Sequence, residues 1–219
     1  MTATAQQLST VTRRALWALG LLLAAAVLVP QLAKAATPAE TFVQDNINKG
    51  LVILNDKALS KDQRRDQFEK FLFGLTDMKS LAVDSLGVYR RGASQTDIDS
   101  FTVAFQNYFA AVFQSYFDKY TSQSLKVVGS QELSPDEIYV TTQLINPADK
   151  SGNPPTQIVF RLANTNGRIV VTDASVGGVR LLFTKKSEFQ AVLGDNDGKI
   201  PVLVQKLNTI TANIKTSLR

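Results

Sequence analysis

The chain of 219 residues contains neither histidine nor cysteine. Without histidine, Ser-His-Asp triads, Cys-His pairs and most zinc sites are excluded. Without cysteine no disulfide framework can form, so the stability must come from a hydrophobic core, which a domain of this length can build. These two absences remove much of enzyme chemistry and favour a binding function.

The N-terminal segment contains no acidic residue before Glu40. Arg13 and Arg14 are followed by an apolar stretch at 15–32 and by the small-x-small sequence Ala-Lys-Ala at 33–35. This pattern predicts a secretory signal peptide over residues 1–35, cleaved after Ala35, and a single domain over 36–219. The alternative is an uncleaved membrane anchor, since the stretch is close to the ~18 residues that a spanning helix needs.

The predicted domain of residues 36–219 has only a small excess of positive charge. The peptide takes three of the 24 basic residues and none of the 19 acidic ones, so the formal net charge falls from +5 to +2. The basic character of the full chain is therefore partly a property of the export signal. We expect no nucleic-acid partner.

Helical signals fill the first half of the predicted domain. The segments 37–40 and 60–63 are capping boxes that predict two helix starts, and Thr76 or Asp77 is expected to cap a third helix. A long aromatic helix is predicted near 95–123. Two further helices are predicted at the end of the chain, near 185–193 and 199–217.

Strand signals separate these two groups of helices. Runs rich in β-branched residues are bounded by turn residues, and Asn166-Gly167 is a two-residue hairpin signal. The predicted antiparallel strands are 124–131, 137–146, 155–164 and 168–175, with 179–183 as a candidate for a short fifth. Segregated helices and strands indicate an α+β fold.

The aromatic helix carries five phenylalanines at four-residue spacing, from Phe101 to Phe117. Each step of four advances a side chain by about 40°, so the five sweep about 160° of the helix surface. Such a wide face fits a central core helix covered by a curved sheet. It also fits a helix that lines an apolar cavity, because rigid aromatic side chains make good cavity walls. Periodicity alone does not separate the two interpretations.

Three stretches of the chain resemble a known family, the MlaC-like periplasmic phospholipid-binding proteins, also called toluene-tolerance proteins. They are SLGVYRRGASQTDIDSFTVAFQNYF (85–109), NPPTQIVFRL (153–162) and TDASVGGVRLLFTKKSEFQAVL (172–193). The last is similar to the family's Asp, Gly-Val and Lys/Arg-Ser-x-Phe pattern, here Asp173, Gly178-Val179 and 186–189.

The resemblance implies a helical layer on a strongly curved antiparallel sheet of four to five strands, similar to the nuclear-transport-factor-2 and cystatin-like folds, enclosing an apolar cavity. It implies a soluble periplasmic carrier of phospholipid, or of a hopanoid-type lipid, with no enzymatic activity and no cofactor or metal. The implied partners are an outer-membrane lipoprotein/porin complex and an inner-membrane ABC transporter with an MCE-domain subunit.

The candidate lipid-binding residues are apolar side chains on the predicted aromatic helix and on the predicted strands. They are Phe105, Phe109, Val112 and Phe113 for one wall, and Val140, Leu144, Ile158, Phe160 and Val171 for the other. Basic residues predicted near the cavity edge, for contact with lipid headgroups or acidic partners, are Arg90, Arg91, Arg180, Lys185 and Lys186.

Two other functions are compatible with the same pattern. An enzyme of this fold would have Asp77, Asp84 and Asp173 as its acid–base candidates, although no paired-carboxylate spacing singles them out. A structural adaptor would have a filled core and only protein partners. A carrier differs from both in needing an accessible apolar cavity.

Overall fold

A computed structural model of the chain describes residues 35–117, 120, 122–165 and 167–218, and the predicted signal peptide, apart from Ala35, lies outside them. Residues 36–219 form one compact unit. None of its described helices is long and apolar enough to cross a bilayer. The elements, in chain order, are α2 (Pro38–Asn55), α3 (Lys61–Gly74), α4 (Met78–Ser85), the 3-10 helix η1 (Gly87–Gly92), α5 (Gln95–Phe117), β1 (Ser124–Ser134), β2 (Glu137–Ile145), β3 (Gln157–Thr165), β4 (Arg168–Val176), β5 (Val179–Arg180), α6 (Leu181–Gly194) and α7 (Ile200–Ser217).

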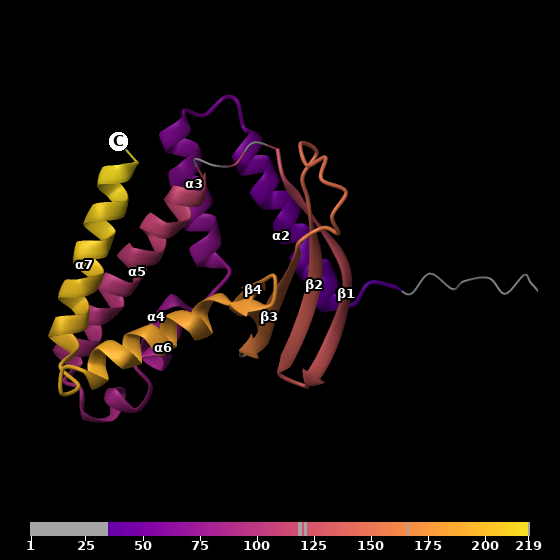
Figure 1. The fold of residues 1–219 in the computed structure, drawn as a ribbon. Helices are drawn as coiled ribbons and strands as arrows, with labels where there is room; N and C mark the ends of the chain where they lie inside the picture. Colours follow the sequence, from indigo (N-terminus) through magenta and orange to yellow (C-terminus); the bar gives the residue numbers. More distant parts are fainter. Residues whose placement is uncertain (1–34, 118–119, 121, 166, 219) are drawn as a thin grey trace, which may run out of the picture. The chain divides into compact units, whose positions relative to one another are not determined.

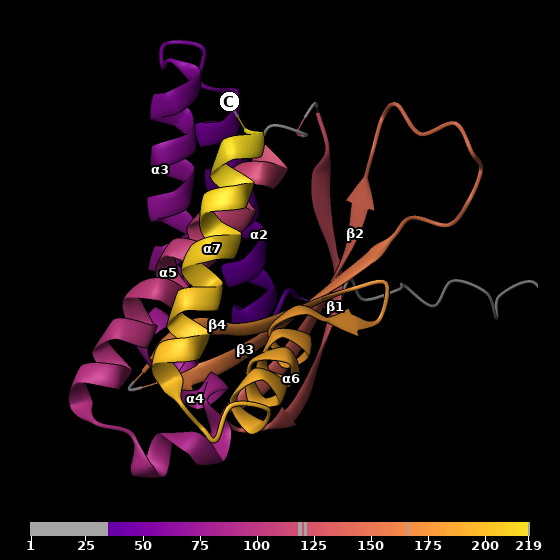
Figure 2. The same cartoon turned by 60° about the vertical axis from the view of Figure 1, so that its left-hand side comes forward.

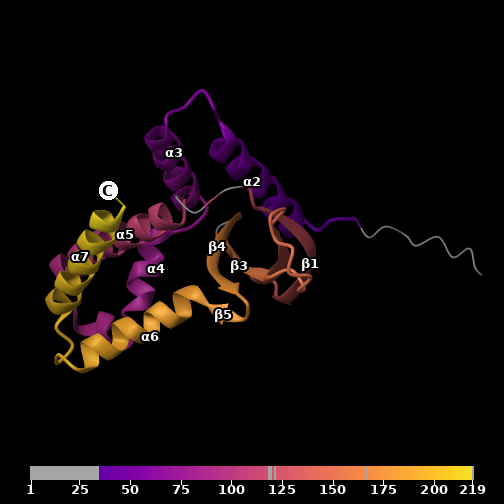
Figure 3. The ribbon, with the colours of Figure 1, turned by 45° about the horizontal axis from the view of Figure 1, so that its top comes forward.

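The five strands form one antiparallel sheet in the order β1-β2-β3-β4-β5. The predicted α+β fold with an antiparallel sheet is confirmed, and the sheet is open rather than closed into a barrel. Thr165 pairs with Arg168 across the β3–β4 hairpin, where Gly167 has a φ of +77°, a value that glycine adopts without strain. Asn166, the other residue of the predicted turn, lies outside the described residues. Strand β1 shows register shifts at 127–129 and 132–134. Figure 3 shows the sheet as a curved layer.

The helices divide between two hydrophobic clusters. Helix α2 packs on β1 and β2, where Val43 and Ala39 join the fully buried sheet residues Val140 and Leu162. Helix α5 is the centre of the second cluster and packs against α4, α6 and α7. Figures 1 and 2 show α7 alongside α5, while α2 lies against the sheet. The wide aromatic face of α5 therefore has helices on several sides.

Local capping sets the starts of the first helices as predicted. The Thr37 side chain accepts a hydrogen bond from the Glu40 backbone and the Glu40 carboxylate accepts one from the Thr37 backbone, and Ser60 and Gln63 form the same box at α3. At α4 the cap is Asp77, which accepts hydrogen bonds from the Ser80 amide at 3.0 Å and from the Ser80 hydroxyl at 2.7 Å. These caps satisfy amides that have no partner within the helix.

Helix α6 begins earlier than predicted, at Leu181 instead of residue 185, and β5 is correspondingly shorter. Its cap comes from another strand: the carboxylate of Asp173 in β4 accepts a hydrogen bond from the Leu182 amide at 2.9 Å. The same carboxylate pairs with the Arg180 guanidinium at 3.0 Å and is 4 % exposed. Because this buried carboxylate is fully partnered within the fold, its role is structural.

Two hydrogen bonds to backbone carbonyls, one from a backbone amide and one from a side chain, join strand β4 to the end of α3. The Val171 amide donates a hydrogen bond to the Leu75 carbonyl at 2.8 Å, and the Arg168 guanidinium donates one to the Gly74 carbonyl at 2.8 Å. The turn between α3 and α4 therefore covers the part of β4 that β5 leaves unpaired.

Replacing Asp77 by alanine is expected to lower the free energy of unfolding by about 1 kcal/mol at neutral pH, because the α4 cap is lost. The Ser80 amide, then the Ser80 hydroxyl, hold the pKa of Asp77 below its ordinary value of 3.8. A depressed pKa means that the cap contributes fully above the unfolded pKa and is lost as pH falls through the folded pKa. Urea unfolding at pH 7 and below pH 3 measures this difference.

The control is Asp66→Ala, which removes an exposed carboxylate of α3 that has no bonding partner in the described part of the chain. We expect its effect to stay within about 0.5 kcal/mol at both pH values. The assignment of the cap would be contradicted if Asp77→Ala lowered the free energy of unfolding as much below pH 3 as at pH 7.

Candidate functional site

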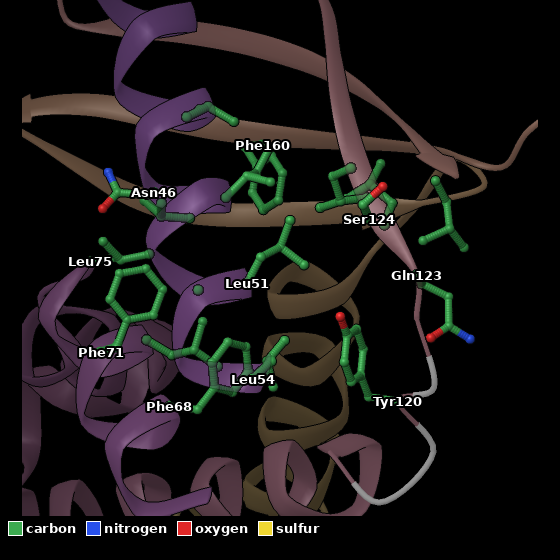
Figure 4. A pocket seen from close by; sticks show the side chains of 18 of the residues that line it. Asn46, Leu51, Leu54, Phe68, Phe71, Leu75, Tyr120, Gln123, Ser124 and Phe160 are labelled. Carbon is green, nitrogen blue, oxygen red and sulfur yellow. The ribbon is translucent and has the colours of Figure 1, made fainter. Parts of the chain in front are cut away.

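An apolar cavity of about 280 Å³ lies between helices α2 and α3 and the sheet. Figure 4 shows its side chains converging from both layers around a common space. The lining residues are Phe42, Val43, Asn46, Ile47, Gly50, Leu51, Leu54, Phe68, Phe71, Leu72, Leu75, Tyr120, Gln123, Ser124, Leu125, Leu144, Ile158, Phe160 and Val171.

The chemistry of the lining is that of a hydrocarbon site. Among the described residues that line it, none carries a formal charge, and the polar side chains are only those of Asn46, Tyr120, Gln123 and Ser124. The Asn46 amide already donates to the Phe42 carbonyl at 2.8 Å, so it is partly satisfied within α2. An empty space lined in this way favours apolar ligands over water, which needs two to four polar partners.

The helical wall of the cavity follows from the spacing of apolar residues on α2 and α3. Residues 43, 47, 51 and 54 of α2 recur at helical intervals and so lie on one face. Gly50 on that face gives room to α3: a Cβ atom there would be 3.2 Å from the Phe71 ring and 3.3 Å from the Phe68 ring. The missing side chain lets α3 bring the rings of Phe68 and Phe71 close to α2.

The sheet wall comes from alternate residues of neighbouring strands. Four of the five predicted sheet residues, Leu144, Ile158, Phe160 and Val171, line the cavity. The fifth, Val140, is fully buried in the cluster between α2 and the sheet and is not part of the lining.

The predicted helical wall is different from the observed one. The structure places Phe105, Phe109 and Val112 in the cluster that α5 forms with α6 and α7, and Phe113 contacts the Phe73 ring of α3 at 6.1 Å. None of these four residues lines the cavity. The physical reason is that α5 lies between other helices, so its aromatic face is filled by side chains such as Phe189, whose ring is 6.2 Å from that of Phe105.

Comparison with known proteins agrees with this architecture of a sheet, a helical layer and a cavity between them. Residues 44–209 match the family model described as MlaC protein. The chain belongs to the MlaC family. A solved structure of a phospholipid-binding protein from Ralstonia solanacearum, in complex with a phospholipid, is similar in fold, with a TM-score of 0.70 and 16 % identity over 82 % of this chain and 99 % of that one. No curated protein sequence matches the chain significantly.

The predicted basic rim of this MlaC family member does not border the apolar cavity. Arg90 pairs with Asp84 at 2.6 Å, Arg91 is exposed on η1, and Lys185 pairs with Glu188 at 2.8 Å. Arg180 and Lys186 line a separate polar cleft of about 460 Å³ between α4, α6 and the sheet. The five cations are thus distributed over surfaces other than the cavity lining.

Each of the three carboxylates considered for an enzyme has a structural partner, and two of them, Asp84 and Asp173, line the polar cleft. Asp77 caps α4, Asp84 pairs with Arg90, and Asp173 caps α6. No group of three or more acidic side chains in the described part of the chain is arranged to hold a metal ion. Asp77, Asp84 and Asp173 are thus each engaged in a structural contact, whereas the described residues that line the apolar cavity carry no formal charge.

Proposed function

We propose that this MlaC family protein is a non-catalytic carrier that binds phospholipid acyl chains in the cavity between α2, α3 and the sheet. The observation that carries the proposal is a cavity of about 280 Å³ whose lining has no charged side chain among the described residues. Membership of the MlaC family and the phospholipid bound to the structurally similar Ralstonia protein support the same ligand. Leu144, Ile158, Phe160 and Val171 would contact the chains from the sheet.

The energetics of lipid transfer explain why an apolar cavity is sufficient for this function. A lipid with two chains of about 16 carbons exposes roughly 30 methylenes, which costs on the order of 24 kcal/mol in water at ~0.8 kcal/mol each. A carrier lowers this cost by offering an environment similar to the bilayer interior. Transfer then needs no nucleophile, metal or cofactor, in accordance with the absence of histidine and cysteine.

The size of the cavity indicates that its helical wall moves when lipid enters. A cavity of about 150 Å³ holds one benzene, and by that scale 280 Å³ holds roughly 11 carbons, less than one full acyl chain. Helix α3 has no fully buried side chain, whereas α5 has several, so an outward shift of α3 costs less packing than a shift of α5. We infer that the remainder of the two acyl chains occupies the space opened by this shift.

The cellular setting completes the proposal. Residues 1–35 would be removed as a signal peptide, and the domain of residues 36–219 would act in the periplasm. There it would shuttle phospholipid between an outer-membrane lipoprotein/porin complex and an inner-membrane ABC transporter with an MCE-domain subunit, in an Mla-type pathway. Direction would come from these partners, because a passive cavity only equilibrates lipid between them.

The test is to purify the protein from cells, extract it with organic solvent and identify bound lipid by mass spectrometry. We expect phospholipid in a near-stoichiometric amount, and uptake of phospholipid from vesicles by the delipidated protein. A polycyclic, hopanoid-type lipid in its place would change the assigned cargo. A protein that carries no lipid and takes none from vesicles would instead fit a structural adaptor and would refute the carrier function.

A further inference from the structure

Arg64 continues the cavity-facing side of α3 beyond the last aromatic ring. It precedes Phe68 by four residues, so the two side chains lie on the same face of the helix. Its guanidinium Nη1 is 3.5 Å from the Leu54 carbonyl at the end of α2. Leu54 and Phe68 both line the cavity, and Figure 4 shows them with Tyr120 at one end of it. Arg64 therefore stands at that end of the cavity.

The guanidinium of Arg64 is poorly satisfied by the protein. Its Nε is buried and has no hydrogen-bond partner, and the contact with the Leu54 carbonyl is at the limit of a hydrogen bond. No carboxylate of the described residues forms an ion pair with it. Arg64 is partly exposed, and because its guanidinium has five N–H donors of which the buried Nε is unpaired, it favours a ligand that supplies anionic oxygen atoms.

The neighbouring cation is engaged differently. Arg65 also has a buried Nε without a partner, but its terminal nitrogen pairs with Asp62 at 2.8 Å. Its charge is therefore largely neutralised, while that of Arg64 is not. Arg64 is the better candidate for binding an anion.

Neutral polar groups gather at the same end of the cavity. The Asn55 amide donates to the Tyr120 hydroxyl at 3.3 Å, and Gln123, another polar residue of the lining, follows Tyr120 closely in sequence. Elsewhere the helices are joined to the sheet, because the Val171 amide donates to the Leu75 carbonyl and the Ser130 hydroxyl donates to Glu40 at 2.7 Å. The polar end is the natural position for a headgroup, with the chains directed inward.

We propose that Arg64 binds the phosphodiester oxygens of the lipid headgroup and so makes the cavity selective for phosphate-bearing lipids. This rests on the proposed function, because it assumes that acyl chains occupy the cavity. A planar guanidinium can donate two parallel hydrogen bonds to a phosphate. This interaction is stronger than the single long hydrogen bond to the Leu54 carbonyl. Arg64 leaves the Leu54 carbonyl and pairs with the phosphate when the lipid enters.

The experiment compares two ligands with identical acyl chains, a phospholipid and a diacylglycerol that lacks the phosphate. Binding of each to the purified protein is measured by displacement of a fluorescent acyl probe. Arg64→Gln should weaken phospholipid binding about tenfold and leave diacylglycerol binding unchanged, with Arg64→Lys in between. Lys70→Gln, which removes an exposed charge from the same helix, should change neither.

Each outcome decides the matter. A phospholipid preference that survives Arg64→Gln overturns the proposal, and so does an equal loss of both ligands, which would indicate a structural role. A third result would also overturn the proposal. If a fatty acid and millimolar inorganic phosphate both displace the phospholipid, with equal affinity, the site binds free anions and not the lipid headgroup. If the wild type binds the two lipids equally, only this inference fails. If it binds neither, the carrier function itself fails.

Discussion

Ile158→Trp is expected to abolish most lipid binding while leaving the protein folded. Ile158 lines the cavity from β3, and tryptophan is well tolerated in strands, so the indole should occupy the empty space instead of disrupting a packed core. Each displaced methylene costs about 0.8 kcal/mol, so losing even two lowers the affinity by about 1.6 kcal/mol, more than a factor of ten. Mass spectrometry of co-purified lipid and vesicle uptake measure the effect.

Two further variants make this result specific. Leu51→Trp adds the same bulk from α2 on the opposite wall and should have the same effect. Val103→Trp adds it at a position of α5 that is 57 % exposed, and should leave lipid binding unchanged. If both cavity variants retain full lipid while remaining folded, acyl chains bind elsewhere on the protein.

Phe105→Ala is expected to lower the free energy of unfolding by about 3–5 kcal/mol. The side chain is 1 % exposed and lies 5.9 Å from the Phe101 ring and 4.6 Å from the Phe109 ring, measured between centroids. Its removal leaves a cavity in the densest part of the helical core. Because domains of this kind are stable by only about 5–15 kcal/mol, chemical denaturation should show a large shift of the midpoint.

The matched variant is Phe160→Ala, which removes the same side chain from the cavity wall. It should cost less stability, because one side of that ring already faces empty space, and it should change the lipid bound. The folded fraction of Phe105→Ala should bind lipid normally. A loss below about 1 kcal/mol for Phe105→Ala together with loss of lipid would return α5 to the role of a cavity wall.

Helix starts could be predicted from the sequence wherever the cap is local. Both capping boxes, at Thr37 and at Ser60, are written within four residues, and both helices begin where they predict. The start of α6 could not be predicted in this way. Its cap is Asp173, nine residues before Leu182 and in a different strand, so the hydrogen bond exists only after the strand and helix are brought together.

The sheet wall of the cavity could be predicted from the sequence better than its helical wall. The four predicted sheet residues in the lining lie on strands that were recognisable from their β-branched residues. The helical wall was misassigned because a wide apolar face reveals burial but not the partner that covers it. In α5 the partners are α6 and α7, far ahead in sequence. The observed wall came from α2 and from α3, whose mixed pattern of Phe68, Phe71 and charged neighbours gave a weaker signal.

Both edges of the sheet have features that hinder pairing with a strand of a second copy. On one side, β1 is interrupted by two register shifts that twist its free edge. On the other side, the Val171 amide donates a hydrogen bond to the Leu75 carbonyl, and β5 pairs with the last residues of β4. An exposed strand edge presents unpaired backbone N–H and C=O groups, on which a strand of a second copy could pair. These two devices leave few main-chain groups on which a second copy could begin to grow.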